Sequence, residues 1–467
     1  MRKNNTLIFF KLIILVNILF FFNSCNYKKD SNVFFIGGEI INPSSSEVNI
    51  YRNNIKIDSI ELDNKNTFFK QINNVNSGIY RIEHLPEYQN ILVDKGDSIW
   101  IRVNAEDFSE SLSFTGKGSS KNNFLIDISN YLNNEDDFLS NMYSENSTIF
   151  KEIIDSLSLE KENIWNDFIK SGVQSKLSEK VTKSSILYSY ANRLERYALL
   201  RGSNWNSSDT KKYFNYRNNL NLNDKDLILF EPYITYLMNY FNKSVLDSSQ
   251  VYFYQKNNTD FNIKKLVLID SEIKDNDLKN ILSRATAVEE LLNFKNHDYH
   301  EKFIGYYSYI NSSQTYYDEI IKLHNDINKM QSGKMLPEIN LMNFNQDIIS
   351  SLDVFNKNKT LIYFWSQTQM NHYRRTIRRV NKLEEKFPEY RYVGICIQPY
   401  NYLVNQAQTI LNVTIDDQFS FRNFESSSKD WVLTYLNKAI IIDRKSKIID
   451  GFGNLFSNSI EESLSRY

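Results

Sequence analysis

Thiols and imidazoles are the side chains of this sequence whose chemistry can be judged first. The chain contains two cysteines, Cys25 and Cys396, and five histidines. Thiol–disulfide exchange within one chain needs two thiols that can meet, one of which attacks as a thiolate. The two cysteines have different surroundings, because Cys25 ends an apolar run near the N-terminus whereas Cys396 lies inside an apolar run with strand character.

Cys25 follows a segment with the features of a secretory signal. Arg2 and Lys3 precede an apolar run over residues 12–22. This run is shorter than the roughly 20 apolar residues of a transmembrane helix, so it predicts a cleaved signal peptide over residues 1–24. The sequence Phe22-Asn23-Ser24-Cys25 resembles the lipobox of bacterial lipoproteins, which implies that the Cys25 thiol carries lipid. A plain secretory signal with an unmodified Cys25 is the alternative.

Lipidation would determine both location and redox chemistry. Two or three acyl chains hold a protein stably on a membrane, where a single chain is marginal. The resemblance therefore implies a membrane contact through Cys25, a short tether over residues 25–32, and an outer membrane lipoprotein of the cell envelope that faces the periplasm. It also leaves Cys396 as the one remaining thiol, which excludes a disulfide or a dithiol cycle within the chain.

Charge and composition exclude several other classes of protein. The 55 Lys and Arg residues balance 56 Asp and Glu residues, so there is no electrostatic footprint for nucleic acid. No cofactor motif is present. His297 and His300 could offer metal ligands, but no third ligand cluster accompanies them, so we expect a solvated helix end and no metal site.

Residues 33–116 have the pattern of a small antiparallel β-sandwich. Short β-branched or aromatic runs cover residues 48–51, 55–62, 79–83, 91–93 and 99–103, and turn residues such as 63–66 and 95–97 separate them. The segment resembles an N-terminal β domain, of unknown function, found in front of thioredoxin-like domains in Bacteroidetes lipoproteins. The resemblance is carried by residues 58–60, 78–80, 95–98 and 114–118, followed by Asn122 and Asn123.

Helical periodicity replaces the strand pattern over residues 117–332. One apolar face is formed by Leu187, Tyr190, Ala191, Leu194 and Ala198, and we expect Lys183, Arg193 and Arg196 to mark the polar face. Tyrosine-rich stretches at 230–241 and 306–317 indicate core or interhelix packing rather than a cofactor site.

Residues 333–467 alternate strands and helices, which indicates an α/β layer arrangement. Strands are predicted at 361–365, 392–397, 439–443 and 447–451, and helices at 370–387, 402–411 and 459–465. The run 361–365 is apolar throughout, as in a strand buried on both faces. The fold class predicted for the whole chain is multidomain α+β, with an N-terminal antiparallel β-sandwich, a helical middle region and a C-terminal α/β domain.

This C-terminal part resembles the TlpA-like thioredoxin family of envelope disulfide reductases and its peroxiredoxin relatives. The resemblance rests on Leu336-Pro337, Tyr363-Phe364-Trp365, Ile440-Ile441-Ile442-Asp443 and Lys447-Ile448. In that family a Cys-x-x-Cys pair opens the helix after the first core strand, and a cis proline faces it. The resemblance places Gln369 and His372 at the cysteine positions and Asn437 at the proline position.

The substitutions remove the chemistry of the family. A carboxamide provides no nucleophile comparable to a thiolate, and Cys396 should be buried with a raised pKa. A cis bond without proline costs about 2.5–4 kcal/mol, so the Asn437 loop is predicted to be trans. The basic residues Arg374, Arg375, Arg378 and Arg379 could meet an anionic partner or form a solvated face.

These residues lead to three hypotheses about the function. The leading hypothesis is a non-enzymatic, membrane-anchored envelope lipoprotein with a redox-inactive thioredoxin-like domain and a binding or scaffold role toward a protein, peptide or glycan. The alternative is a thiol–disulfide oxidoreductase or peroxiredoxin-like enzyme that uses Cys396. A third hypothesis is a hydrolase centred on His372, which would need an aligned hydroxyl and a carboxylate such as Asp443.

Overall fold

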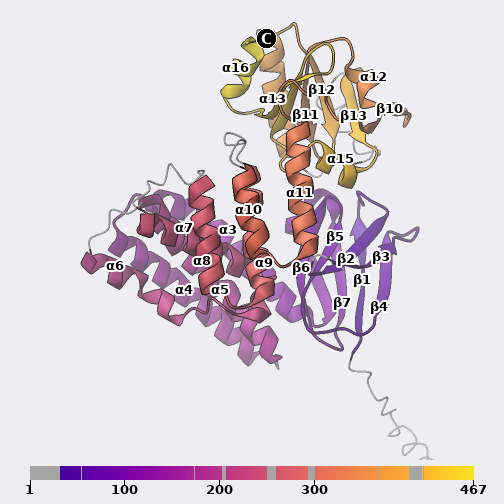
Figure 1. Ribbon diagram of the computed structural model, residues 1–467. Helices are drawn as coiled ribbons and strands as arrows, with labels where there is room; N and C mark the ends of the chain where they lie inside the picture. Colours follow the sequence, from indigo (N-terminus) through magenta and orange to yellow (C-terminus); the bar gives the residue numbers. More distant parts are fainter. Residues whose placement is uncertain are drawn as a thin grey trace, which may run out of the picture.

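The computed structural model describes residues 32–466, apart from residues 54, 173, 202–206, 250–258, 293–299, 368, 399–412 and 414. The protein is a mixed α/β multidomain chain: strands come first, then a long series of helices, then a mixed sheet with helices around it. Figure 1 shows the C-terminal sheet at one end of the molecule, joined to the helices through α11 (Gln314–Lys329). The predicted signal peptide, Cys25, His297 and the predicted helix 402–411 lie outside the described residues.

The N-terminal strands form two four-stranded sheets with the orders β4-β1-β7-β8 and β3-β2-β5-β6. Their apolar faces enclose one core that includes Phe34, Val48, Ile82 and Ile101. The strands are β1 (Phe34–Ile41), β2 (Glu47–Arg52), β3 (Ile55–Glu61), β4 (Thr67–Ile72), β5 (Gly78–His84), β6 (Glu87–Val93), β7 (Ser98–Asn104) and β8 (Ser113–Lys117). A short helix, α2 (Phe108–Ser111), lies between β7 and β8.

The sandwich differs from the sequence prediction in one pairing. An antiparallel sandwich was expected, but β1 runs parallel to β7, with Ile36 opposite Ile99. The strands β1, β4 and β8 were not among the predicted runs, because Gly37, Gly38 and Gly116 interrupt two of them and β4 is half polar. The predicted turn at residues 63–66 is present, and the Asp63 carboxylate accepts hydrogen bonds from the backbone N–H groups of Lys65 and Thr67.

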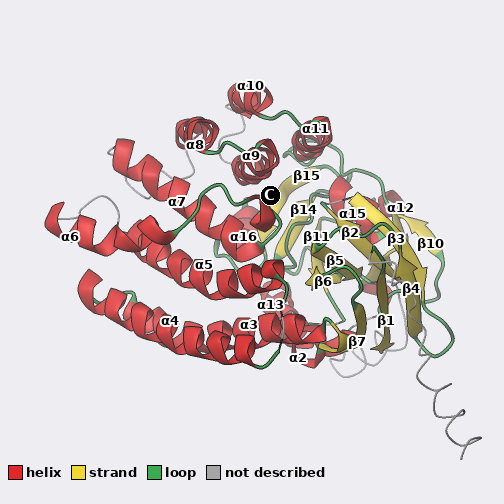
Figure 2. Cartoon of the chain, turned by 90° about the horizontal axis from the view of Figure 1, so that it is seen from below, coloured by secondary structure: helices red, strands yellow, loops and turns green. Residues whose placement is uncertain are grey.

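The middle region is helical, and α5 (Lys176–Arg201) lies at its centre. This helix packs against α3 (Ser119–Met142), α4 (Ser147–Lys170) and α7 (Glu231–Ser249), as Figure 2 shows from below. The other helices are α6 (Ser207–Tyr213), α8 (Thr259–Glu272), α9 (Asn276–Leu291) and α10 (His300–Ile310). The tyrosine-rich stretch at 230–241 supplies core residues, since Tyr233 and Tyr236 are fully buried.

The polar face predicted for α5 is wrong at Arg193. Lys183 and Arg196 are exposed, but Arg193 is buried and its guanidinium lies 2.5 Å from Glu135 and 3.0 Å from Asp136, both on α3. A buried charge is tolerated when it is paired and hydrogen-bonded. Because the partners lie more than 50 positions away in the sequence, local periodicity could not reveal them.

Asparagine side chains attach α3 to the β-sandwich. The carboxamide of Asn122 accepts from Leu92 N and donates to Leu92 O in β6, while that of Asn123 makes the same pair of bonds with Phe114 in β8. Next to them the buried Lys121 ammonium lies 2.6 Å from both Asp94 and Asp97. These contacts satisfy backbone groups of two strands and fix the start of the helical region against the sheets.

The C-terminal sheet has seven strands in the order β10-β9-β13-β12-β11-β14-β15. Its central strand β11 (Thr360–Trp365) is buried along its whole length, runs parallel to β12 (Arg391–Cys396) and is antiparallel to β14 (Lys438–Ile442). The other strands are β9 (Asn340–Met342), β10 (Ile348–Ser350), β13 (Gln418–Phe421) and β15 (Ile448–Asn454). The helices are α12 (Ser351–Phe355), α13 (Met370–Lys386), α15 (Phe424–Asp430) and α16 (Ser459–Ser465).

The predicted elements of this part are confirmed within one to three residues wherever the structure describes them. The segment after α11 is joined to the sheet edge, since Gly333 N donates to Ile448 O and Ile448 N donates to Lys334 O. Gly451 is required in β15 because a Cβ there would overlap the carbonyl of Met330. Helices α9–α11 and one face of the sheet therefore share a continuous apolar core.

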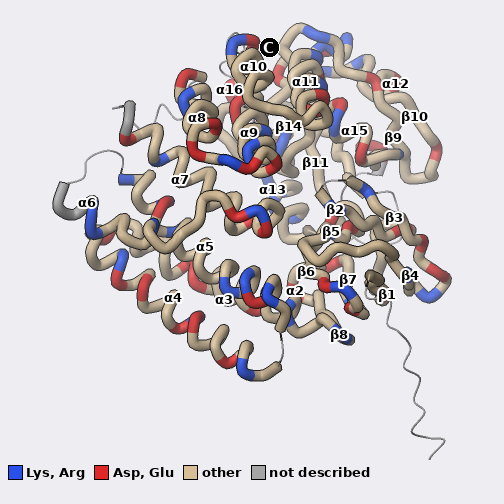
Figure 3. The backbone as a smooth tube through the Cα atoms, turned by 60° about the horizontal axis from the view of Figure 1, so that its bottom comes forward, with Lys and Arg blue, Asp and Glu red and all other residues tan. Residues whose placement is uncertain are grey.

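Basic and acidic residues alternate along the described backbone, as Figure 3 shows, in agreement with the balanced composition. Within the described ranges, no helix is both long and apolar enough to cross a bilayer.

Candidate functional site

The first candidate site is the start of α13, where β11 ends. Gln369 is the N-cap residue, but its side chain makes no capping hydrogen bond and is exposed. One turn later Tyr373 stacks on Trp365, with ring centroids 3.9 Å apart, which holds the helix against the end of the strand. The position that corresponds to the first cysteine of the resemblance is thus occupied by an exposed carboxamide.

His372 is buried and contacts the loop before β14. Its Nε2 lies 2.7 Å from the side-chain oxygen of Asn437, which can accept a hydrogen bond from a protonated Nε2. The other ring nitrogen, Nδ1, is buried without a hydrogen-bond partner in the part of the chain that the structure describes. The structure thus brings together two residues 65 positions apart, at the places that the resemblance assigns to the second cysteine and the facing proline.

The geometry around His372 lacks the partners of a hydrolytic site. Within the described residues, neither ring nitrogen forms an ion pair with a carboxylate or a hydrogen bond with a hydroxyl group. Asp443 closes the hairpin between β14 and β15 instead, where its carboxylate accepts from the backbone N–H groups of Lys445 and Lys447. A general base needs such partners within about 3 Å to activate a nucleophile.

The loop that holds Asn437 has no cis peptide bond, as predicted. Within the described residues the cis peptide bond is Leu85–Pro86, so the bond before Asn437 is trans. The carbonyl of Asn437 accepts a hydrogen bond from Leu455 N, which ties the loop to the end of β15.

Cys396 lies at the end of β12, in the apolar cluster that also contains Trp365 and Tyr373. It is completely buried, and burial raises the pKa of its thiol to about 12. Its Sγ lies 3.4 Å from the side-chain oxygen of Gln398, which also accepts from Gln367 N. The carboxamide nitrogen of Gln398 donates to the Ser366 hydroxyl. The thiol is therefore a protonated, enclosed group, as expected for Cys396 from the sequence.

A buried lysine follows Asn437 directly and was missed by sequence reasoning. The Lys438 ammonium donates to the carbonyls of Trp431 and Val432 and lies 4.5 Å from the centre of the Phe452 ring. Burial lowers its pKa to about 7, although the charge of Asp450 acts in the opposite direction. The sequence signal that could have indicated it is a lysine at the start of an otherwise apolar strand.

The basic residues of α13 do not act as one group. Arg379 is bound to the Glu461 carboxylate and to the carbonyls of Leu455 and Ser457, whereas Arg374, Arg375 and Arg378 are not buried.

The prediction of a solvated helix end at the histidine pair is wrong at His300, which is fully buried at the start of α10. No group of three or more metal-ligating residues occurs among the described residues.

Comparison with known proteins gives fold neighbours and no family. No family model and no curated protein matches the chain. Among solved structures, a thiol-disulfide oxidoreductase from Bacteroides fragilis is 21% identical over 28% of this chain and 98% of its own, with a TM-score of 0.23. The thioredoxin domain of a thiol-disulfide oxidoreductase from Bacteroides vulgatus is 14% identical over 29% of this chain and 98% of its own, with a TM-score of 0.23.

A longer match is a thioredoxin-like protein from Bacteroides caccae, which is 10% identical over 59% of this chain and 94% of its own, with a TM-score of 0.33. These neighbours are thioredoxin-like, and the thiol-disulfide oxidoreductases among them correspond to less than a third of the chain.

Proposed function

We propose that this protein is a lipid-anchored lipoprotein of the cell envelope whose thioredoxin-like domain binds a partner and performs no thiol chemistry. One observation supports the proposal above all others. The helix tip carries Gln369 and His372, His372 is bonded to Asn437 across the site, and Cys396 is completely buried. A disulfide reductase needs an accessible thiolate at this place, and each of these residues works against one.

The competing function is an oxidoreductase or peroxiredoxin-like enzyme that uses Cys396. Its thiol would have to lose a proton with a pKa near 12 and reach a substrate from a fully buried position. Within the described residues no cation contributes to that pKa, and the side-chain hydrogen-bond partner of the sulfur is the neutral Gln398. Both the charge and the access that thiol exchange requires are therefore missing.

Insulin reduction tests the redox part of the proposal. Full-length protein purified from envelope membranes is mixed with insulin and dithiothreitol, and the turbidity is compared with that of the Cys396→Ser variant. We expect both proteins to match the rate of dithiothreitol alone. A rate above this background in the wild type that disappears in Cys396→Ser would overturn the proposal in favour of the enzyme.

The anchor is tested separately by metabolic labelling with a palmitate analogue. We expect the label in the wild type and its loss in Cys25→Ser, together with release of the variant from the membrane fraction. Labelling that is unchanged in Cys25→Ser would remove the anchor from the proposal, and an unlabelled wild type would favour the plain secretory signal.

The binding surface can be located by photocrosslinking in intact envelopes. A photoreactive residue replaces the exposed Gln369 at the start of α13, and the matched control replaces Lys445 in the exposed turn between β14 and β15, at the other end of the sheet. A crosslinked product specific to position 369 supports a partner at the helix tip. Equal products from both positions would show that this surface is not the binding site.

A further inference from the structure

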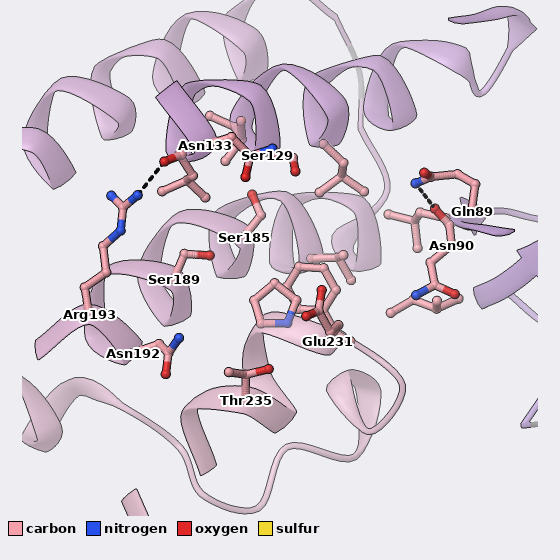
Figure 4. Close-up of a pocket in the computed structure, with 18 of the residues that line it drawn as sticks. Gln89, Asn90, Ser129, Asn133, Ser185, Ser189, Asn192, Arg193, Glu231 and Thr235 are labelled. Carbon is pink, nitrogen blue, oxygen red and sulfur yellow. Dashed lines mark hydrogen bonds between the residues drawn. The ribbon is translucent and has the colours of Figure 1, made fainter. Parts of the chain in front are cut away.

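A large polar cleft lies between the β-sandwich and the helical region. It has a volume of about 560 Å³ and is lined by β5 and β6 on one side and by α3, α5 and the start of α7 on the others. This is the size range in which proteins bind small organic ligands. Figure 4 shows the side chains that surround it, which come from four separate segments of the chain.

Small hydroxyl and carboxamide side chains line much of this cleft. Ser185, Ser189 and Asn192 fall on one face of α5, Asn133 faces them from α3, and Thr235 faces them from α7 (Figure 4). Within the described part of the chain, no hydrogen bond to protein is formed by the side chains of Asn133, Ser189 or Thr235. These groups are therefore available as donors and acceptors for a polar ligand.

The charges around the cleft cancel. The Arg193 guanidinium is already occupied by Glu135, Asp136 and the Leu132 carbonyl. The other charged lining residues are Arg196 and Glu231, which are exposed and of opposite sign. With one unmatched charge of each sign, this hollow of about 560 Å³ offers no net field that would select a strongly ionic ligand.

The cleft continues beyond Tyr88. A second hollow of about 170 Å³ shares Ile79, Tyr88 and Asn90 with the first, so Tyr88 stands where the two meet. Two arginines also line this second hollow: Arg81 is paired with Glu83, and the Arg52 guanidinium lies over the Tyr80 ring. The Tyr88 side chain is 58% exposed although it belongs to β6, and it offers an aromatic surface with a polar tip to a ligand that passes from one hollow to the other. An elongated ligand fits this shape better than a compact one.

We propose that this cleft binds an uncharged oligosaccharide. Such a ligand presents hydroxyl groups around its edge, which match the unpaired Asn133, Ser189 and Thr235 side chains, and apolar C–H faces, which match the Tyr88 ring. Its chain of sugar units suits two connected hollows. The site uses no residue of the thioredoxin-like domain, so this proposal does not depend on whether that domain is redox-active.

Saturation-transfer NMR and calorimetry test the inference with defined probes on the full-length protein in detergent. The probes are cellotriose, xylotriose and mannotriose, with trigalacturonate as an acidic sugar and an N-acetylated tripeptide amide as a neutral peptide. We expect at least one neutral trisaccharide to bind. Loss of one hydrogen bond in Ser189→Ala or Thr235→Val should then weaken its affinity by about three- to tenfold.

Tyr88→Ala should also weaken binding, whereas Tyr309→Ala should leave it unchanged, because Tyr309 is 86% exposed on α10 and does not line the cleft. Thermal unfolding of each variant shows whether the fold is kept. The proposal is overturned if no neutral trisaccharide binds, if binding survives Ser189→Ala and Thr235→Val undiminished, or if trigalacturonate or the tripeptide binds more tightly than every neutral sugar.

Discussion

Lys438 should give the protein an unusual gain of stability at alkaline pH. Burial lowers the pKa of Lys438 to about 7 in the folded protein, whereas a lysine in the unfolded chain has a pKa near 10.4. Between these two values the unfolded chain binds a proton that the folded protein does not bind. The free energy of unfolding therefore rises with pH across this window, and the contribution is lost as pH falls toward 7.

The size of the effect follows from the two pKa values. Between pH 7.5 and pH 9.0 this group alone should raise the free energy of unfolding by about 2 kcal/mol. Lys438→Met removes the titration, and the loss of its donors to Trp431 and Val432 adds an offset that does not depend on pH.

Urea unfolding of the wild type and of Lys438→Met at both pH values measures the difference. Lys445→Met, at an exposed lysine in the turn of the same β14–β15 hairpin, should keep the pH dependence of the wild type. Parallel pH profiles for the wild type and Lys438→Met would refute the reasoning, since Lys438 would then remain charged in the fold.

Two further predictions concern hydrogen bonds and ion pairs. Asn437→Ala leaves the buried Nε2 of His372 without an acceptor and should lower the free energy of unfolding in urea by about 1–3 kcal/mol. In the His372→Ala background the same substitution should cost less, because the contact is already lost. Equal costs in both backgrounds would contradict the contact. Lys121→Met leaves Asp94 and Asp97 unpaired and should cost about 3–5 kcal/mol, against about 0.5 kcal/mol or less for Lys151→Met, which removes an ion pair with the exposed Asp155. Similar costs for the two lysine variants would show that the Lys121 cluster does not fasten α3 to the sandwich.

The sequence predicted best those strands and helices whose burial follows from the pattern of their own residues. The apolar run at 361–365 indicates a doubly buried strand, and β11 is buried at every residue. The amphipathic segment after it gives α13 within one residue of its predicted end. The burial of Cys396 follows for the same reason, because its neighbours in the strand are apolar on both sides.

Features that depend on distant partners were not predictable. The parallel pairing of β1 with β7, the burial of Arg193 against Glu135 and the contact of His372 with Asn437 each join residues more than 50 positions apart. The hydroxyl-lined cleft was not predicted, because the sequence around Ser189 and Thr235 does not show that α5 and α7 pack with these two side chains on the same cleft.

The central claim, that the C-terminal α/β domain presents no reactive thiol, is tested most directly by the rate at which iodoacetamide alkylates Cys396. The experiment uses Cys25→Ser, so that Cys396 is the only thiol, and compares native protein with protein in urea at pH 8 by mass spectrometry. A pKa of about 12 leaves roughly a thousandfold less thiolate than an ordinary cysteine has, so we predict native alkylation at least three orders of magnitude slower than in urea. Native and unfolded rates within about tenfold of each other would contradict the claim, because they would require an exposed and ionised Cys396.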